Sequence, residues 1–368
     1  MLAQRSGRTP GLRPRLRAAL LLGLIGAAAC GAGPVRPAPA SAQEFLYVAS
    51  QEDVTVAVID MGSNTLVETV DLKELGFSPT AKAHHTAVES DGSFWYVSLI
   101  ADGKILKFDR GNRLVGQADF ETPGMLALDP TSELLYVGRS MAAVNPPQRV
   151  GVINRTTMEI EEVDVFFPRP HALAVDPKGH RFFAASLGQN SIAWAPLGDE
   201  DVDLMEVDGM MNHMFVQFAV SPDGRWMVGG GQMTGDLLVF DLSGDEPQVV
   251  ESVDVGGQPW HPTWSPDGGT VWIPNQAANT VTVVDSNTWT VTDVIAHPAL
   301  IEPHGSAVSP DGRTIFVSSR NVAGTYRPAD GSDGRPGTVV AIDAETHEVM
   351  AVIEVGRYAA GMSAASRR

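Results

Sequence analysis

The chain repeats one pattern of strands and turns about every 45 residues, and this repeat restricts the folds that its 368 residues can adopt. One part of the pattern is a turn of the Ser-Pro-Asp-Gly type, in which Pro presets φ, Asp caps its own backbone and Gly accepts a positive φ. Turns of this kind begin at residues 89, 128, 175, 221, 265 and 309. The other part is an alternating apolar strand, usually ending in Asp, whose copies end at residues 60, 109, 154, 196, 241, 285 and 343.

The spacing of these strands predicts the architecture. Successive copies lie 42 to 49 residues apart, except for a last interval of 58 that contains a Gly/Asp/Pro-rich insertion at residues 321–337. Four short strands fit in each repeat, and repeats of this length are typical of the blades of a β-propeller. Helix-like periodicity is missing from the body of the chain, which excludes a helical solenoid. A β-sandwich needs only about 100 residues, whereas here the unit recurs along the whole body.

The number of blades follows from a mismatch between the two parts of the pattern. Seven alternating strands are present but only six of the turns, and the repeat opens at residues 45–50 with a run typical of a second strand. The segment 355–365 is similar to the segment that leads into a first strand at residues 302–308. We therefore predict an all-β, seven-bladed β-propeller. Its C-terminal segment supplies the inner strand of the N-terminal blade, which leaves no open edge in the ring.

These repeats resemble the YVTN-type (YncE-like) β-propeller family. The resemblance covers residues 45–365 and rests on Tyr96-Val97-Ser98, Phe316-Val317-Ser318-Ser319, the Ser-Pro-Asp-Gly turns and the Val-x-Val-x-Asp strands. It implies an exported protein, since members of the family are exported and mostly have no assigned role. The wider group includes the copper-binding propeller of nitrous oxide reductase, the haem d1 domain of nitrite reductase and lactonase-like enzymes. The resemblance therefore leaves the chemistry open.

Residues 1–42 have the pattern of an export signal. They hold six arginines, no acid and an apolar run at residues 18–29 that is too short to span a bilayer. Two processing routes stay open: cleavage after Ala42 at the Ala-Ser-Ala motif, or lipidation of Cys30, the one cysteine of the chain. In the second route the lipid is the membrane attachment. Either route predicts a periplasmic or secreted protein in which residues 43–368 form one propeller domain.

The charge balance limits the partners. The net charge is -18, and residues 43–368 alone carry -24 because the first 42 residues hold six arginines and no acid. So negative a field argues against nucleic acid bound through its phosphates. We expect a monomer whose partner is an envelope protein, a polymer or a small ligand.

Six of the nine histidines lie at or just before the starts of predicted first strands. They are His84, His85, His171, His213, His261 and His304. Three of them, His84, His171 and His304, occupy equivalent positions relative to the following turn. In a propeller the first strands line the central channel, so these side chains would form a ring at one mouth. Imidazoles gathered there would bind copper or another transition metal, or act as axial ligands to haem.

Two other roles fit the same histidines. The repeat itself favours His in this position, where the ring can hydrogen-bond backbone carbonyls between blades. The histidines could also serve in acid–base catalysis. The sequence leaves these alternatives open.

The insertion and one tryptophan add candidate ligand-binding residues at the same mouth of the channel as the histidines. Trp260 occupies a histidine position, and the insertion follows a second strand, whose end shares a face with the starts of the first strands. Loops on one face of a rigid scaffold commonly bind ligands. We expect Arg320, Tyr326 and Arg327, together with Trp260, to contact an anionic or aromatic ligand. A loop without function fits the sequence equally well.

Three classes of function remain. A non-catalytic binding or scaffold propeller of the cell envelope is favoured, because no G-x-S-x-G elbow, phosphate loop or H-E-x-x-H motif is present. The second class is a metal- or haem-dependent oxidoreductase or a metal carrier that uses the histidines. The third is a lactonase-like hydrolase.

Overall fold

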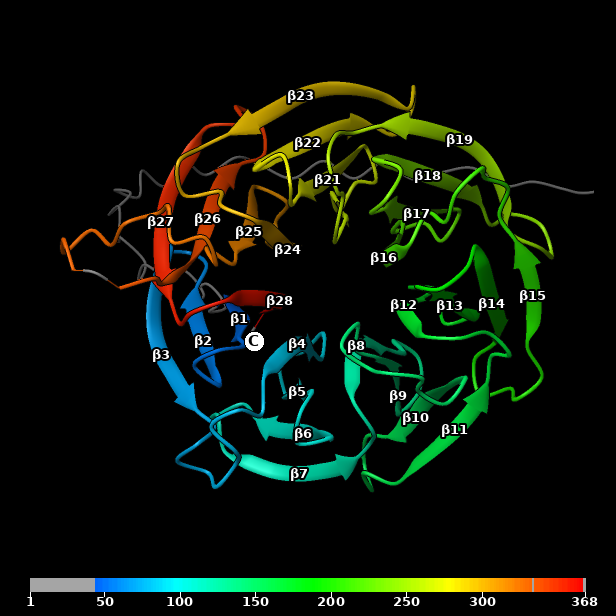
Figure 1. The fold of residues 1–368 in the computed structure, drawn as a ribbon, viewed down its shortest axis with the longest axis horizontal. Coiled ribbons are helices and arrows are strands. Elements are labelled where there is room, and N and C mark those ends of the chain that lie inside the picture. Colours follow the sequence, from blue (N-terminus) through cyan, green and yellow to red (C-terminus); the bar gives the residue numbers. More distant parts are fainter. Residues whose placement is uncertain (1–43, 333, 367–368) are drawn as a thin grey trace, which may run out of the picture. The chain divides into compact units, whose positions relative to one another are not determined.

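The computed structural model describes residues 44–332 and 334–366, which form seven four-stranded antiparallel sheets arranged as the blades of a ring (Figure 1). This confirms the all-β, seven-bladed propeller. The export signal predicted for residues 1–42, with Cys30 and the cleavage site after Ala42, lies outside the described residues. Across the described ranges, no helix has the length and apolarity needed to cross a bilayer.

The first four blades contain sixteen strands. From the inner to the outer strand they are β28 (Ala359–Ser366), β1 (Glu44–Ser50), β2 (Thr55–Asp60) and β3 (Thr65–Asp71); β4 (Ala83–Val88), β5 (Phe94–Leu99), β6 (Lys104–Asp109) and β7 (Leu114–Asp119); β8 (Pro123–Leu128), β9 (Leu134–Arg139), β10 (Arg149–Asn154) and β11 (Ile160–Asp164); β12 (Pro170–Val175), β13 (Arg181–Ser186), β14 (Ser191–Pro196) and β15 (Asp203–Glu206).

The remaining three blades follow in the same order. Their strands are β16 (Phe215–Val220), β17 (Trp226–Gly231), β18 (Asp236–Asp241) and β19 (Gln248–Asp254); β20 (Thr263–Trp264), β21 (Thr270–Asn275), β22 (Thr280–Asp285) and β23 (Thr290–Ala296); β24 (Pro303–Val308), β25 (Thr314–Ser319), β26 (Gly337–Asp343) and β27 (Val349–Val355).

The Ser-Pro-Asp-Gly turns connect the inner strand of a blade to its second strand. After β16, the hydroxyl of Ser221 donates to the carboxylate of Asp223 at 2.6 Å and accepts from the backbone N–H of Trp226 at 2.9 Å. Gly224 completes the turn with φ of 73°, a conformation that glycine adopts without steric cost. The turn at residues 309–312 repeats the same hydrogen bonds, with a glycine φ of 75°.

The predicted closure of the ring by the C-terminal segment is confirmed. β28 pairs antiparallel with β1, so the last strand of the chain completes the N-terminal blade. Each inner strand contacts the next around the ring, and β28 contacts both β24 and β4. Just before β28, Nε of Arg357 donates to Oδ1 of Asp53 at 2.7 Å, and the N–H of Gln51 donates to the carbonyl of Tyr358 at 3.0 Å.

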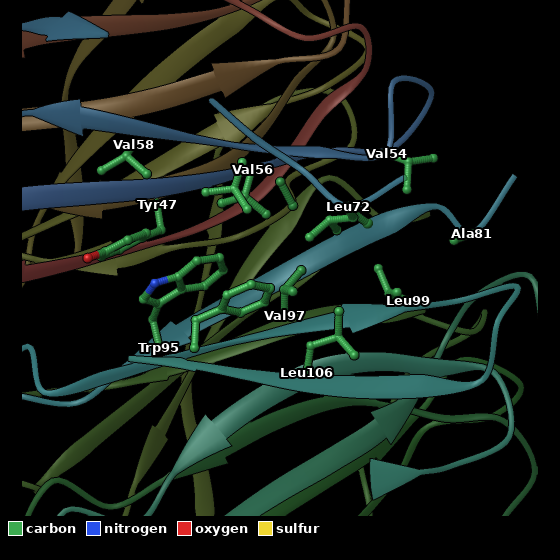
Figure 2. Close-up of a cluster of buried hydrophobic side chains, with 14 of the residues drawn as sticks. Tyr47, Val54, Val56, Val58, Leu72, Ala81, Trp95, Val97, Leu99 and Leu106 are labelled. Atoms are coloured by element: carbon green, nitrogen blue, oxygen red, sulfur yellow. The ribbon is translucent and has the colours of Figure 1, made fainter. Parts of the chain in front are cut away.

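Each interface between neighbouring blades holds a cluster of buried apolar side chains. Figure 2 shows the cluster between the N-terminal blade and the blade of β4 to β7, where Trp95 stacks on Tyr47 with ring centroids 4.9 Å apart. On its other side Trp95 stacks on Phe108 at 4.1 Å. Burying a large apolar side chain contributes about 1.5–3 kcal/mol. These clusters therefore fix each blade against its neighbours, and with it the position of each inner strand.

Candidate functional site

The strand register places four of the predicted site residues at equivalent positions. The residue before each of them pairs with the last residue of the neighbouring second strand, in the pairs Ala83 with Leu99, Pro170 with Ser186, Pro259 with Asn275 and Pro303 with Ser319. The next residue along the chain is His84, His171, Trp260 or His304. The equivalence predicted from the spacing of the repeats is therefore matched by the hydrogen-bonded register at the N-terminal ends of the inner strands.

Five histidine rings meet at this end of the ring of inner strands. His304 lies at the centre of the group, with its ring centroid 4.6 Å from that of His261 and 5.7 Å from that of His84. His84 lies 6.3 Å from His171, and His85 lies 5.8 Å from His261. We call His84, His85, His171, His261 and His304 the histidine cluster. The indole of Trp260 lies against it, 4.4 Å from the ring of His304.

The spacing of the rings is close to that of histidines that share a metal ion. With metal–nitrogen distances of about 2.0–2.1 Å, two imidazoles on one ion have centroids roughly 4.5–5.5 Å apart. Three pairs in the cluster, at 4.6, 5.7 and 5.8 Å, are near this range. Within the described parts of the chain, no set of three or more His, Cys, Asp or Glu side chains is already arranged as a metal site. Binding of one ion would therefore require the imidazoles to turn toward a common point.

Hydrogen bonds orient two of the five rings. Nδ1 of His171 donates to the backbone carbonyl of Arg139 at 2.6 Å, which leaves the lone pair on Nε2. The side-chain amide of Gln51 contacts Nδ1 of His84 at 2.7 Å, and an amide can present either its oxygen or its NH2 group there. A bond of this kind to the far nitrogen is what commonly orients a metal-ligating histidine.

Several ring nitrogens of the cluster are buried without a hydrogen-bond partner. They are Nε2 of His84, Nδ1 of His85, Nε2 of His261 and both ring nitrogens of His304. The five side chains are 0–8% exposed, so bulk water does not satisfy these atoms. A buried polar group without a partner costs about 1–3 kcal/mol. The cluster thus concentrates an unusual amount of unsatisfied hydrogen-bonding capacity in one place.

Burial keeps the histidine cluster uncharged. Desolvation, together with the electrostatic effect of His171, lowers the pKa of His85 to about 3. Desolvation is also the main cause for His171, whose pKa falls to about 4. The pKa values of His84, His261 and His304 lie well below the usual value, first because of burial and then because of the other histidines. At neutral pH all five rings are neutral, which is the form of histidine that binds metals.

The structure does not bring His213 into the cluster. Nε2 of His213 donates to the carbonyl of Asp208 at 3.0 Å, and Nδ1 lies 3.2 Å from the hydroxyl of Thr234. Both ring nitrogens therefore have partners, one in the same loop and one in the loop between β17 and β18, and the ring stacks on Phe215 with a centroid separation of 5.4 Å.

Arg320 lies beside the cluster, whereas Tyr326 and Arg327 of the insertion do not. The guanidinium of Arg320 lies 5.4 Å from the ring of Trp260 and 4.8 Å from that of Tyr358. In contrast, the hydroxyl of Tyr326 donates to Glu354 of the outer strand β27 at 2.9 Å, and Figure 1 shows the insertion (orange) beside β27. Arg327 is exposed. Of the insertion-side residues predicted to meet a ligand, Arg320 is the one in contact with Trp260.

Two adjoining cavities lie near the cluster, linked to it by Gln51 and Arg320, and the sequence did not point to most of their residues. A cavity of about 400 Å³ is lined by Glu52, Arg320, Asn321, Val322, Gly334, Arg335, Arg357 and Tyr358. A second, of about 300 Å³, is lined by Gln51, Glu52, Pro79, Thr80, Lys82, Arg357 and Tyr358. The segment 355–365, which contains Arg357 and Tyr358, predicts the closing strand of the ring but does not by itself predict a cavity wall.

The fold and the site together define a class: a seven-bladed β-propeller with five buried histidines at the N-terminal ends of its inner strands.

No protein-family model matches the sequence, and no curated protein matches it. The fold is shared with solved structures. A functionally unknown protein from Desulfotomaculum acetoxidans aligns with a TM-score of 0.69 at 12% identity, over 88% of this chain and 99% of that one.

Two further solved structures show the same architecture. A proposed 6-phosphogluconolactonase from Bacteroides uniformis aligns with a TM-score of 0.66 at 13% identity, over 88% of this chain and 99% of that one. AztD from Citrobacter koseri, known also in an apo form, aligns with a TM-score of 0.62 over 88% of this chain and 98% of that one. Its sequence is 8–9% identical. Identities this low show the fold alone.

Proposed function

We propose that this protein is a metal-binding propeller of the cell envelope, with a zinc or copper ion held by the histidine cluster. The observation that carries the proposal is the set of five ring nitrogens that are buried together without a hydrogen-bond partner. Coordination of one ion would satisfy several of them at once. Imidazole is a ligand that suits both zinc and copper.

Three histidines of the cluster are the best candidates for the first ligands. His261 and His304 are the closest pair, at 4.6 Å, and His84 is the next neighbour of His304, at 5.7 Å. His171 is the candidate for a further ligand, because its Nδ1 is held by the carbonyl of Arg139 and its Nε2 keeps a lone pair. Both ring nitrogens of His304 lack a partner, so this histidine should contribute most.

A binding role agrees with the chemistry of the cluster better than catalysis does. A general base works best with a pKa near the working pH, whereas the pKa values of His85 and His171 are lowered to about 3 and about 4. A lactonase-like activity would rest only on likeness of fold at 13% identity, which does not carry function. The location in the envelope rests on the export pattern of residues 1–42.

Metal titration tests this function. The purified protein is stripped with a chelator, and the binding of Zn²⁺ and Cu²⁺ at pH 7 is followed by calorimetry and elemental analysis. We expect one high-affinity ion per chain. His304→Ala should lose it, and His171→Ala should bind it more weakly.

An exposed histidine provides the matched control. The side chain of His180 is 67% exposed and pairs with Asp176 away from the cluster, so His180→Ala should bind metal like the wild type. Less than about a tenth of an ion per chain after reconstitution would refute the proposal. Equal binding by the wild type and by His304→Ala would also refute it.

A further inference from the structure

The larger cavity beside the histidine cluster is lined by three arginines, in a protein that is otherwise strongly acidic. Arg320, Arg335 and Arg357 face a space of about 400 Å³, and Glu52 is the acidic residue of its lining. Across the whole chain, 44 acids outnumber 26 bases, so a cavity rich in arginine runs against the overall charge. A cavity of this size is in the range that holds a small molecule.

A smaller cavity adjoins the larger one. It shares Glu52, Arg357 and Tyr358 with the larger one and adds Lys82. It is also lined by Gln51, whose amide contacts His84. On the other side, Arg320 lies over Trp260, which in turn contacts His304. The two cavities therefore share part of their lining, and each includes a residue that contacts the cluster or the adjoining Trp260.

Arg320 is held in a position suited to a ligand. Its side chain is 14% exposed and lies against the faces of Trp260 and Tyr358. Its nearest acid is Glu302, at 3.9 Å, and its buried Nε has no hydrogen-bond partner. A fixed guanidinium loses little freedom when it binds an oxyanion through its parallel N–H groups.

The other two arginines differ in how much charge they offer. Arg357 is engaged by Asp53 at 2.7 Å and by Glu52 at 3.8 Å. Arg335 is exposed, and no carboxylate of the described residues forms an ion pair with it. Among the described residues, Arg335 thus offers an unpaired positive charge to the larger cavity, and Arg320 has only a long ion pair with Glu302, at 3.9 Å. The two arginines lie at opposite ends of the insertion.

We propose that the larger cavity binds a small organic anion with two or more carboxylate or phosphate groups, one held by Arg320 and another by Arg335. The guanidinium group of arginine can donate two parallel hydrogen bonds to a carboxylate or to a phosphate. Two such arginines favour a ligand with two charged groups over a ligand with one. The site does not depend on a metal ion in the histidine cluster. The two proposals can therefore fail separately.

Calorimetry on the metal-free protein tests this proposal, with citrate and pyrophosphate as probes and acetate as the singly charged comparison. We expect citrate or pyrophosphate to bind one site, and acetate to bind at least about tenfold more weakly, because it engages one arginine instead of two. Arg335→Gln and Arg320→Gln should each weaken binding by about tenfold or more. Binding of citrate alone would identify a carboxylate ligand, and binding of pyrophosphate alone a phosphate ligand.

Two controls keep the test decisive. Arg149 is a half-exposed arginine that pairs with Asp164, and both lie on a blade that does not line the cavity. Arg149→Gln should therefore bind the probe like the wild type. Arg335 is exposed, so Arg335→Gln should fold normally even if Arg320→Gln does not. The proposal is overturned if neither probe binds the wild type, or if Arg335→Gln binds as tightly as Arg149→Gln.

Discussion

At the scale of single residues, the histidine cluster depends on small neighbours as much as on the histidines themselves. Gly361 of β28 lies so close to β4 that a Cβ atom on it would be 2.3 Å from Cδ2 of His85 and 2.9 Å from the carbonyl oxygen of His84. The glycine makes room for an imidazole supplied by a strand more than two hundred residues away in the chain. The lack of a side chain at Gly361 therefore allows His85 to pack in the cluster.

The first prediction concerns this glycine. Gly361→Ala should destabilise the protein by about 1–3 kcal/mol, because the added methyl group overpacks the contact and must displace His85. Denaturant unfolding of the metal-free protein measures the change. Gly269→Ala is the control, since a Cβ atom there meets only the side chain of Asp267 at 3.4 Å. Equal stability of the two variants would show that the cluster is packed loosely.

The second prediction concerns pH. The pKa values of the five histidines are lower in the folded protein than in the unfolded chain, so the unfolded chain binds more protons as the pH falls. Their stabilising contribution is therefore complete above about pH 6.5 and is lost as the pH falls toward 4. Each histidine can lower the free energy of unfolding by up to about 1.4 kcal/mol per pH unit in this window.

Thermal or denaturant unfolding of the metal-free protein between pH 7.5 and 4.5 measures this effect. The wild type should lose stability steeply below about pH 6.5. His304→Gln, which removes one of the titrating rings, should show a shallower slope. A stability curve that is flat between pH 7 and 5 would contradict the description of the cluster as buried and neutral.

At the scale of secondary-structure elements, β28 links the closure of the ring to the site. It completes the sheet of β1, contacts β4 and β24, and follows the cavity residues Arg357 and Tyr358. This strand therefore closes the fold and packs against His85, and the two residues that precede it help to form the cavity wall. Damage to it should affect stability and ligand binding together.

The third prediction tests this strand. Deletion of residues 356–368 should lower the melting temperature sharply, because the N-terminal blade loses its inner strand and the ring gains an open edge. Differential scanning calorimetry measures the change. A synthetic peptide of the same residues, added to the truncated protein, should restore part of the lost stability. Unchanged melting of the truncated protein would contradict the closure.

The sequence was sufficient for the elements but only partly for the site. The repeat predicted seven blades and their closure, because turn chemistry and strand alternation are local signals. The same register placed His84, His171, Trp260 and His304 in one layer.

The sequence did not predict the directions that the loops take. His213 is engaged by Asp208 in its own loop, and the tip of the insertion packs on β27. The cavity depends on Glu52, which follows β1, and on Arg357, which precedes β28. These two residues meet because β28 pairs with β1.

At the scale of the whole molecule, a neutral cluster lies within a strongly acidic protein. Residues 43–368 carry a net charge of -24, and such a field concentrates cations near the surface. The attraction is screened at high ionic strength, so the rate of metal uptake should fall with added salt while a well-buried site keeps most of its affinity. The ring of blades holds the five histidine side chains together, and the acidic surface would attract the metal ion that we propose they bind.

Pulsed electron paramagnetic resonance of the Cu²⁺-loaded protein tests the central claim most directly. Copper is the suitable probe, because Cu²⁺ has the highest affinity for nitrogen ligands among the divalent first-row metals. The account predicts modulation from the remote nitrogens of more than one imidazole, and weaker modulation in His304→Ala. A spectrum without imidazole modulation, or one that is identical in the wild type and in His304→Ala, would contradict it.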